Sequence, residues 1–98
     1  MAPVAIAVMG AGLIGRRHAA HIAAEPTTRL AAIIDPAPAS RAVAAEYGVR
    51  CYPSFASIPV GQRPDGVVVA TPNQLHVENG LELIAARRVD GSAAICAA

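Results

Sequence analysis

Six residues near the amino terminus and one acid further along have the types and spacing needed to bind a phosphate-bearing ligand. Glycine occupies the first, third and sixth positions of the segment from Gly10 to Gly15, which therefore has the pattern GxGxxG. An apolar run precedes this segment, a helical pattern follows it, and Asp35 stands 20 residues after Gly15. A strand, a glycine turn, a helix and a later acid together form the context in which this pattern binds a dinucleotide.

Each glycine in the segment has a separate physical role. Gly10 permits a tight turn, Gly12 lets a pyrophosphate approach the backbone because it has no Cβ, and Gly15 lets the helix pack close to the strand. The N–H groups near Leu13 and Ile14 are expected to point at the phosphates, whose charge the helix dipole favours. Two alternatives stay open: a glycine turn in another α/β protein, and a methyltransferase-type GxGxG loop, which fits this spacing less well.

Asp35 is predicted to accept hydrogen bonds from the ribose hydroxyls of the adenosine. A 2′-phosphate at this position would face the carboxylate with a repulsion of up to ~4 kcal/mol at ~4 Å and an effective dielectric constant near ~20. We therefore expect NAD as the cofactor, with NADP disfavoured. Arg41 lies six residues further on and could soften this repulsion, although a solvated helix residue is the favoured interpretation.

The elements that must position these residues alternate between strand and helix patterns. Apolar runs followed by turn residues indicate strands, and apolar residues at spacings of three and four indicate helices. Strands are predicted at 4–9, 30–34, 49–52 and 67–70, helices at 13–24, 40–47 and 73–87, one helical turn at 54–58 and a weak strand at 93–96. This alternation predicts a parallel sheet with right-handed crossovers.

Composition excludes several classes of protein. With 98 residues, 54% hydrophobic and 15% charged, the chain is at most one small domain and is not disordered. A net charge of +1 and 3% aromatic residues without Trp argue against nucleic-acid binding. All eight basic residues are Arg, so the chain contains no lysine to act as a base, an acid or a Schiff-base former.

The cysteines and the amino-terminal segment bear on the compartment. Cys51 and Cys96 have the spacing of neither a metal site nor a redox pair, and we expect reduced thiols and no metal. The apolar amino-terminal run is too short to span a bilayer, and its arginines follow it rather than precede it, unlike those of a signal peptide. These features predict a cytoplasmic protein with no membrane partner.

Four stretches of the chain resemble the Gfo/Idh/MocA family of oxidoreductases. The resemblance covers the amino-terminal half of such proteins and about residues 4–88 of this sequence. The matching stretches are VAIAVMGAGLIGRRHAAHI, LAAIIDP, AAEYGVRCYPSF and PDGVVVATPNQLHVE. The last stretch is the most specific, because a glycine loop alone does not predict a Thr-Pro-Asn sequence with a downstream histidine.

The resemblance implies further residues of the cofactor cleft. In such proteins the loop after the fourth strand lies beside the pyrophosphate and the nicotinamide ribose. Carried over, this assigns four residues to the cleft: Thr71, Pro72, Asn73 and His76. Asn73 has a helix cap alone as its alternative role, and His76 is as readily interpreted outside the cleft. His18 and His21 are expected to serve in packing or at the surface.

The chain departs from the family after Arg88. The family continues with a fifth strand that ends in Glu-Lys-Pro, followed by a substrate-binding domain, whereas this sequence ends RRVDGSAAICAA. We interpret 1–88 as an NAD(P)-binding Rossmann-type domain and 89–98 as an atypical tail that arises from truncation or a frame change. The expected fold is a Rossmann-like, doubly wound α/β sheet of about four strands in the order 3-2-1-4, with an incomplete second half. The strand at 67–70 would then be an unpaired edge and favour self-association.

The function that the resemblance implies is that of a dinucleotide-binding, amino-terminal domain of an oxidoreductase acting on sugars or polyols. We expect the chain to be inactive alone and assign it no catalytic residue, because the Glu-Lys-Pro motif and the substrate domain are absent. Two alternatives remain: a stand-alone nucleotide-binding or regulatory module, and a non-functional truncated fragment.

Overall fold

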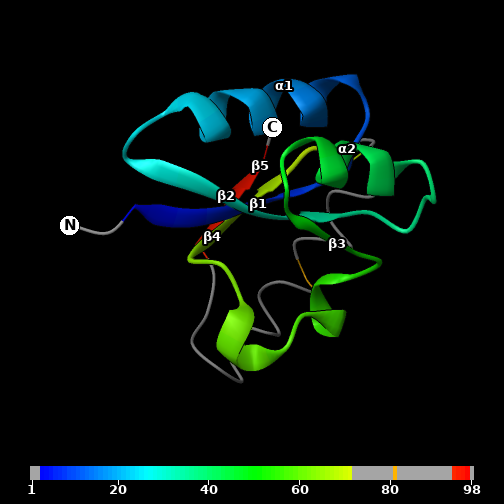
Figure 1. The fold of residues 1–98 in the computed structure, drawn as a ribbon. Helices are drawn as coiled ribbons and strands as arrows, with labels where there is room; N and C mark the ends of the chain where they lie inside the picture. The colour runs from blue at the N-terminus through cyan, green and yellow to red at the C-terminus, as the bar shows by residue number, and fades with distance from the viewer. Residues whose placement is uncertain (1–2, 72–80, 82–93, 98) are drawn as a thin grey trace.

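Five parallel strands form the sheet of this protein. A computed structural model describes residues 3–71, 81 and 94–97, and Figure 1 shows their arrangement. The strands are β1 (Val4–Met9), β2 (Thr28–Ile34), β3 (Arg50–Tyr52), β4 (Gly66–Val69) and β5 (Ala94–Ala97). They lie in the order β3-β2-β1-β4-β5, and every adjacent pair is parallel. The predicted Rossmann-like fold with its 3-2-1-4 order is confirmed, and a fifth strand extends it.

The fifth strand corrects the prediction that β4 lies at the edge of the sheet. β5 pairs with β4 along its whole length, from Gly66 opposite Ala94 to Val69 opposite Ala97. The weak strand predicted at 93–96 therefore forms, displaced by one residue. Its small residues give only a weak strand pattern, and the sequence therefore did not predict that this strand pairs with β4. Because β4 is paired on both sides, it offers no free edge through which two copies of the chain could associate.

Two helices cover one face of the sheet (Figure 1): α1 (Leu13–Ala24) and α2 (Ser40–Glu46). The bounds of α1 match the prediction, since Pro26 disfavours helical backbone in Glu25, which is extended. α2 ends at Glu46, and Gly48, just past its C-cap residue Tyr47, has a φ of +68° that provides the left-handed turn expected there. Between the helices and the sheet lies a buried cluster, to which the strands contribute Val8, Leu30 and Ile33 and the helices Ala19 and Ala44.

The connection between β3 and β4 covers the opposite face. It contains two single turns of 3₁₀ helix, η1 (Phe55–Ser57) and η2 (Val60–Gln62). The first is the helical turn predicted at 54–58, and the second was not predicted. Phe55 and Ile58 are buried there against side chains from β1, β2 and β4, namely Ala7, Met9, Ala32, Ile34, Val67 and Val69.

Strand β2 contains one more residue than its partner. Ile6 lies opposite Leu30, but the next residue, Ala7, lies opposite Ala32, so Ala31 is extra. This bulge places Leu30 under the helices and Ala32 on the opposite face, although residues two apart in a regular strand share a face. The sequence does not reveal this bulge, because residues 30–34 are a continuous apolar run with no alternation.

Candidate functional site

The candidate site lies where the strands end, at the carboxyl edge of the sheet. Backbone hydrogen bonds draw these ends together: the N–H of Gly10 donates to the Ile34 carbonyl at 2.9 Å, and the N–H of Ala70 donates to the Met9 carbonyl at 2.8 Å. Connections from β1 and β4 leave this edge on either side of the point where the strand order reverses. In open parallel sheets that point is where ligands bind.

Gly10 is required by both its conformation and its surroundings. Its φ is +99°, a region that L side chains rarely adopt. A Cβ on this residue would lie 2.9 Å from the carbonyl carbon and oxygen of Ala70 and 3.0 Å from the nitrogen of Thr71. The first glycine therefore makes the turn and also lets the loop pass close to the end of β4.

Gly15 is required by packing alone. A Cβ on Gly15 would overlap the carbonyl oxygen of Gly10 and lie 3.6 Å from a methyl carbon of Val8. The first turn of α1 therefore rests directly on the loop that precedes it. This is the close approach of helix and strand expected from the third glycine of the pattern.

Gly12 differs from the other two glycines of the loop. A Cβ built on Gly12 would meet no heavy atom within 4 Å. Neither its φ of −73° nor the packing of the protein requires glycine at this position. The open space above Gly12 fits a ligand that approaches the backbone closely, such as a pyrophosphate.

The amino terminus of α1 opens onto the same space. Gly12 is its N-cap residue, which provides no side-chain hydrogen bond, and the first turn contains no acidic residue. The first N–H groups of a helix lack partners within it and carry partial positive charge. Leu13 and Ile14 lie at this end and are 68% and 49% exposed. The electrostatics therefore favour an anion beside Gly12.

Asp35 links the glycine loop to the segment after β2. One carboxylate oxygen, Oδ2, accepts a hydrogen bond from the N–H of Ala11 at 2.9 Å. The other, Oδ1, accepts one from the N–H of Ala37 at 2.8 Å. Each carboxylate oxygen has a second lone pair, so the half-buried group can still accept from a hydroxyl.

This bridging role of Asp35 was not predicted from the sequence. An Asp side chain that bonds the N–H two residues on forms an Asx turn, and the Asp-Pro-Ala order provided a signal for it. The bond to Ala11 had no comparable local signal, because it joins residues 24 apart in the chain.

Cys51 and Arg41 lie near Asp35, at the turn that follows β2 (called the Asp35 corner below). The thiol of Cys51 donates to the carbonyl oxygen of Asp35 at 3.7 Å. Burial raises the pKa of Cys51 above its ordinary value, and the negative charge of Asp35 acts in the same direction. The positive charge of Arg41 acts in the opposite direction, so this exposed guanidinium lies within electrostatic reach of the corner.

The structure brings some of the predicted site residues together and does not describe the others. The residues from Gly10 to Gly15 and Asp35 meet at one end of the sheet, and half-buried Thr71 follows β4 beside Gly10. Pro72, Asn73 and His76 lie outside the described residues. On α1, His18 is half-buried and His21 is exposed, in agreement with packing and surface positions.

The described residues contain neither a cluster of metal ligands nor a membrane-spanning helix. Within residues 3–71, 81 and 94–97, no three His, Cys, Asp or Glu side chains gather as metal ligands would. In the same part of the chain, no helix has both the length and the apolar character required to cross a bilayer.

Known proteins share both the sequence and the fold. The rhizopine catabolism protein MocA of Rhizobium meliloti is 31% identical over 80 residues, which are 82% of this chain and 25% of that protein. A myo-inositol dehydrogenase from Corynebacterium glutamicum is 31% identical with a TM-score of 0.76, over 98% of this chain and 28% of its own. The WlbA dehydrogenase from Bordetella pertussis, solved with NADH and UDP-GlcNAcA, is 26% identical with a TM-score of 0.82, over 98% and 29%.

The chain thus spans less than a third of the length of each of these relatives. Residues 4–89 match the model of the oxidoreductase family with an NAD-binding Rossmann fold. The match includes the glycine loop, Asp35 and the four strands from β1 to β4. With an open Gly12 beside an uncapped helix, these residues are the nicotinamide-dinucleotide-binding domain of a Gfo/Idh/MocA oxidoreductase, and the chain belongs to that family.

Proposed function

We propose that this chain binds NAD at the carboxyl edge of its sheet and prefers NAD to NADP. The observation that carries the proposal is the combination of an open Gly12, an uncapped helix terminus and Asp35 hydrogen-bonded to the loop itself. In this proposal ten residues form the cofactor site: Gly10, Gly12, Leu13, Ile14, Gly15, Asp35, Thr71, Pro72, Asn73 and His76.

Each part of the site acts on a different part of the cofactor. The N–H groups at the start of α1 receive the pyrophosphate, with Gly12 leaving room for it. Asp35 uses its remaining lone pairs for the ribose hydroxyls of the adenosine, and its charge repels a 2′-phosphate. The positive charge of Arg41 offsets part of this repulsion, so we expect NADP to bind more weakly than NAD but not to be excluded.

The nicotinamide ring of such a cofactor supplies hydride transfer when a substrate is held against it. We propose that the complete protein acts on a sugar or polyol, as the named dehydrogenases among its relatives suggest. This chain contains no lysine, and we assign it no catalytic residue. We therefore expect no NADH production from inositols or sugars by the purified chain, measured by absorbance.

A stand-alone module that senses the dinucleotide without chemistry is the second candidate function. The same cleft would serve it, so ligand binding alone does not separate the two. A partner whose binding depends on NAD favours this candidate, whereas turnover after addition of a substrate-binding domain favours the oxidoreductase.

Three further parts of the proposal concern partners and location. We infer a cytoplasmic protein with no nucleic-acid partner, from its near-neutral charge and the free thiol of Cys51. Self-association now concerns the outer strands β3 and β5, which are only three and four residues long. Short edges resist pairing with other chains, so sedimentation at tens of micromolar tests whether the domain is monomeric.

Calorimetric titration with NAD, NADP and ADP-ribose tests the cofactor proposal. We expect NAD to bind at least ~10-fold more tightly than NADP, equivalent to about 1.4 kcal/mol. ADP-ribose should bind within a few-fold of NAD, because the described residues contact the adenosine and pyrophosphate half. Equal affinities for NAD and NADP would contradict the role given to Asp35.

Asp35→Ala should weaken NAD binding at least ~10-fold and remove the preference over NADP. Asp65→Ala is a matched control, because Oδ2 of Asp65 also accepts a backbone N–H at 2.9 Å, from Ala5 at the other end of β1. Each variant loses a side-chain bond to the backbone at one end of β1, and Asp35→Ala also loses its bond to Ala37, but only Asp35→Ala should lose affinity for NAD. An equal loss of NAD affinity in both variants would mean that Asp35 stabilises the fold and does not contact the ligand.

A further inference from the structure

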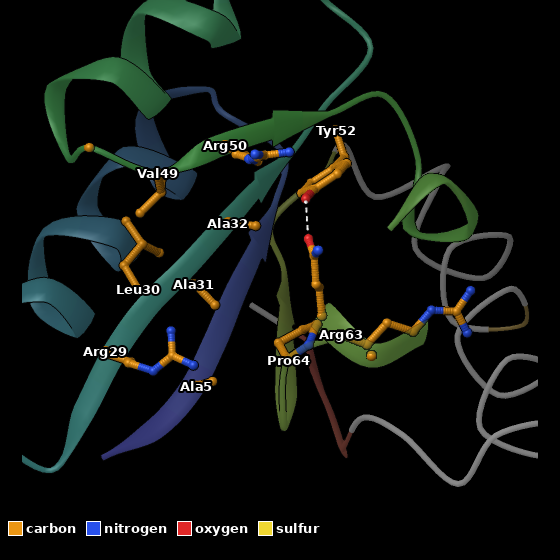
Figure 2. Close-up of a pocket in the computed structure, with 13 residues that line it drawn as sticks. Ala5, Arg29, Leu30, Ala31, Ala32, Val49, Arg50, Tyr52, Arg63 and Pro64 are labelled. Carbon is orange, nitrogen blue, oxygen red and sulfur yellow. Dashed lines mark hydrogen bonds between the residues drawn. The ribbon is translucent and has the colours of Figure 1, made fainter. Parts of the chain in front are cut away.

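A second hollow lies at the opposite end of the sheet from the glycine loop. Its volume is about 570 Å³, within the range of small-molecule sites. Figure 2 shows three alanines along its floor, Ala5 on β1 and Ala31 and Ala32 on β2. The hollow lies near the amino-terminal ends of these strands, on the face that α1 and α2 leave uncovered.

The β3–β4 connection explains why this hollow exists. Phe55 and Ile58 cover the sheet toward its carboxyl edge, where they are buried. Beyond them, Pro59 and Pro64 cannot donate the backbone hydrogen bonds that a longer helix needs, and only the single turn η2 forms between them. Because the floor consists of alanines, it sends no large side chain into the space that remains.

Two arginines stand on opposite sides of this floor. Arg29 on β2 lies opposite Ala5, and Arg50 on β3 lies opposite Ala32. Partners in a parallel pair share a face, so both arginines lie on the face of the hollow. Because Ala31 is the extra residue of the bulge, the two positions are offset by the two strand steps from Ala5 to Ala7, which is roughly 7 Å along the strands. Figure 2 shows the two guanidinium groups at separate edges of the alanine floor.

The charge in the hollow comes from these two side chains. Arg63 also lines it, but its Nε donates to the Ile58 carbonyl at 3.2 Å and its guanidinium lies 4.8 Å from the centre of the Phe55 ring. Figure 2 shows Arg63 turned away from the alanines. Among the described residues that line the hollow there is no acid, and neither Arg29 nor Arg50 has a carboxylate partner in that part of the chain.

One side of the hollow is polar and uncharged, and Leu30, Val49 and Pro64 add apolar lining elsewhere. The hydroxyl of Tyr52 donates to Oε1 of Gln62 at 3.4 Å, which joins β3 to η2 across the side of the hollow (Figure 2). The two ends of the hollow therefore attract anions, and its centre is apolar.

We propose that this hollow binds an elongated organic dianion, with one anionic group at Arg29, the other at Arg50 and an apolar body on the alanines. A guanidinium forms charge-assisted hydrogen bonds with a carboxylate or phosphate, and two of them at separate edges of an apolar floor select for length as well as charge. The site is separate from the dinucleotide cleft, because the two lie at opposite ends of β1.

Amide chemical-shift titration with suberate, a linear dicarboxylate, tests this proposal. Suberate should shift the amides of residues around the floor in a saturable manner, both in the absence and in the presence of excess NAD. Octanoate, which has one carboxylate on a chain of the same length, should bind at least ~10-fold more weakly. Equal binding of the two acids, or displacement of suberate by NAD, would overturn the proposal.

Four variants assign the contacts. Arg29→Gln and Arg50→Gln should each weaken suberate binding at least ~10-fold, whereas Arg17→Gln on α1, an exposed arginine on the other face, should not. Ala31→Leu keeps both charges but fills the floor, and it should abolish binding. Two results would overturn the proposal. One is equal affinity of the wild type and Ala31→Leu for suberate, and the other is an equal loss of affinity in all three arginine variants.

Discussion

The two ends of β1 are tethered by the same chemistry and differ in what surrounds the tether. At the carboxyl end, Asp35 accepts the N–H of Ala11, and at the amino end, Asp65 accepts the N–H of Ala5, both at 2.9 Å. The Asp65 N–H also donates to the Ala5 carbonyl at 2.8 Å, so the amino-end contact is a closed pair of hydrogen bonds. Asp35 instead uses its second oxygen to shape its own turn at Ala37.

This difference shows that a carboxylate bonded to a backbone N–H does not by itself mark a ligand site. What distinguishes the carboxyl end is the open space above Gly12, the uncapped helix terminus beside it and a half-buried acid with lone pairs left over. The amino end has an exposed acid and a hollow lined by arginine. Ligands of different shape and charge distribution are therefore expected at the two ends.

The largest effect should follow from filling the tightest contact of the carboxyl end. Gly15→Ala forces a Cβ onto the Gly10 carbonyl, and we expect a loss of more than ~2 kcal/mol in the free energy of unfolding. Gly61→Ala near the amino end meets no atom within 4 Å and should change it by less than ~1 kcal/mol. Urea unfolding of both variants measures the difference, and equal losses would remove the contrast between the ends.

A smaller effect should separate binding from folding within the glycine loop. Gly12→Ala meets no atom of the protein within 4 Å, so its free energy of unfolding should stay within ~1 kcal/mol of the wild type. Its Cβ would occupy the space given to the pyrophosphate, and NAD affinity should fall at least ~10-fold, or about 1.4 kcal/mol. Unchanged affinity in calorimetry would show that the cofactor does not approach Gly12.

The smallest effect concerns the electrostatic reach of Asp35. Because burial and Asp35 both raise the pKa of Cys51, its alkylation rate should reach its midpoint above the ordinary thiol pKa. Asp35→Asn should lower this midpoint and Arg41→Gln should raise it. The rates are followed by mass spectrometry in a Cys96→Ser background. Shifts in the same direction for both variants would contradict the placement of Arg41 and Asp35 around the thiol.

The sequence predicts most of the fold because local signals and pattern agree at the main elements. Pro26 and Gly48 mark the ends of α1 and α2, and continuous apolar runs mark β1 and the four residues around β4. The bounds of the described elements then differ from the prediction by at most two residues, as in β2, which begins at Thr28 rather than at Leu30. The helix predicted at 73–87 lies, apart from Leu81, outside the described residues. The sheet order follows from the same alternation and from the family resemblance.

Features that depend on tertiary contact escape such analysis. β5 pairs with β4, so β4 is not the edge strand that was predicted. The sequence did not predict this pairing, because the small residues of β5 have little pattern of their own. The bond from Asp35 to Ala11 joins segments 24 residues apart. At the site itself, the glycine spacing and Asp35 were readable from the sequence. Only the structure shows that packing requires glycine at position 15 and does not require it at position 12.

The extra residue in β2 has a consequence for how this domain can change in length. The two neighbouring alanines at 31 and 32 share a single place opposite Ala7, so one of them is spare. Loss of either leaves the same shorter strand, in which Arg29, Leu30 and the isoleucines keep their present sides of the sheet. Loss of Ile33 or Ile34 would instead turn part of the strand inside out. Natural or engineered shortening of this strand should therefore be tolerated at the alanine pair and selected against in the isoleucines.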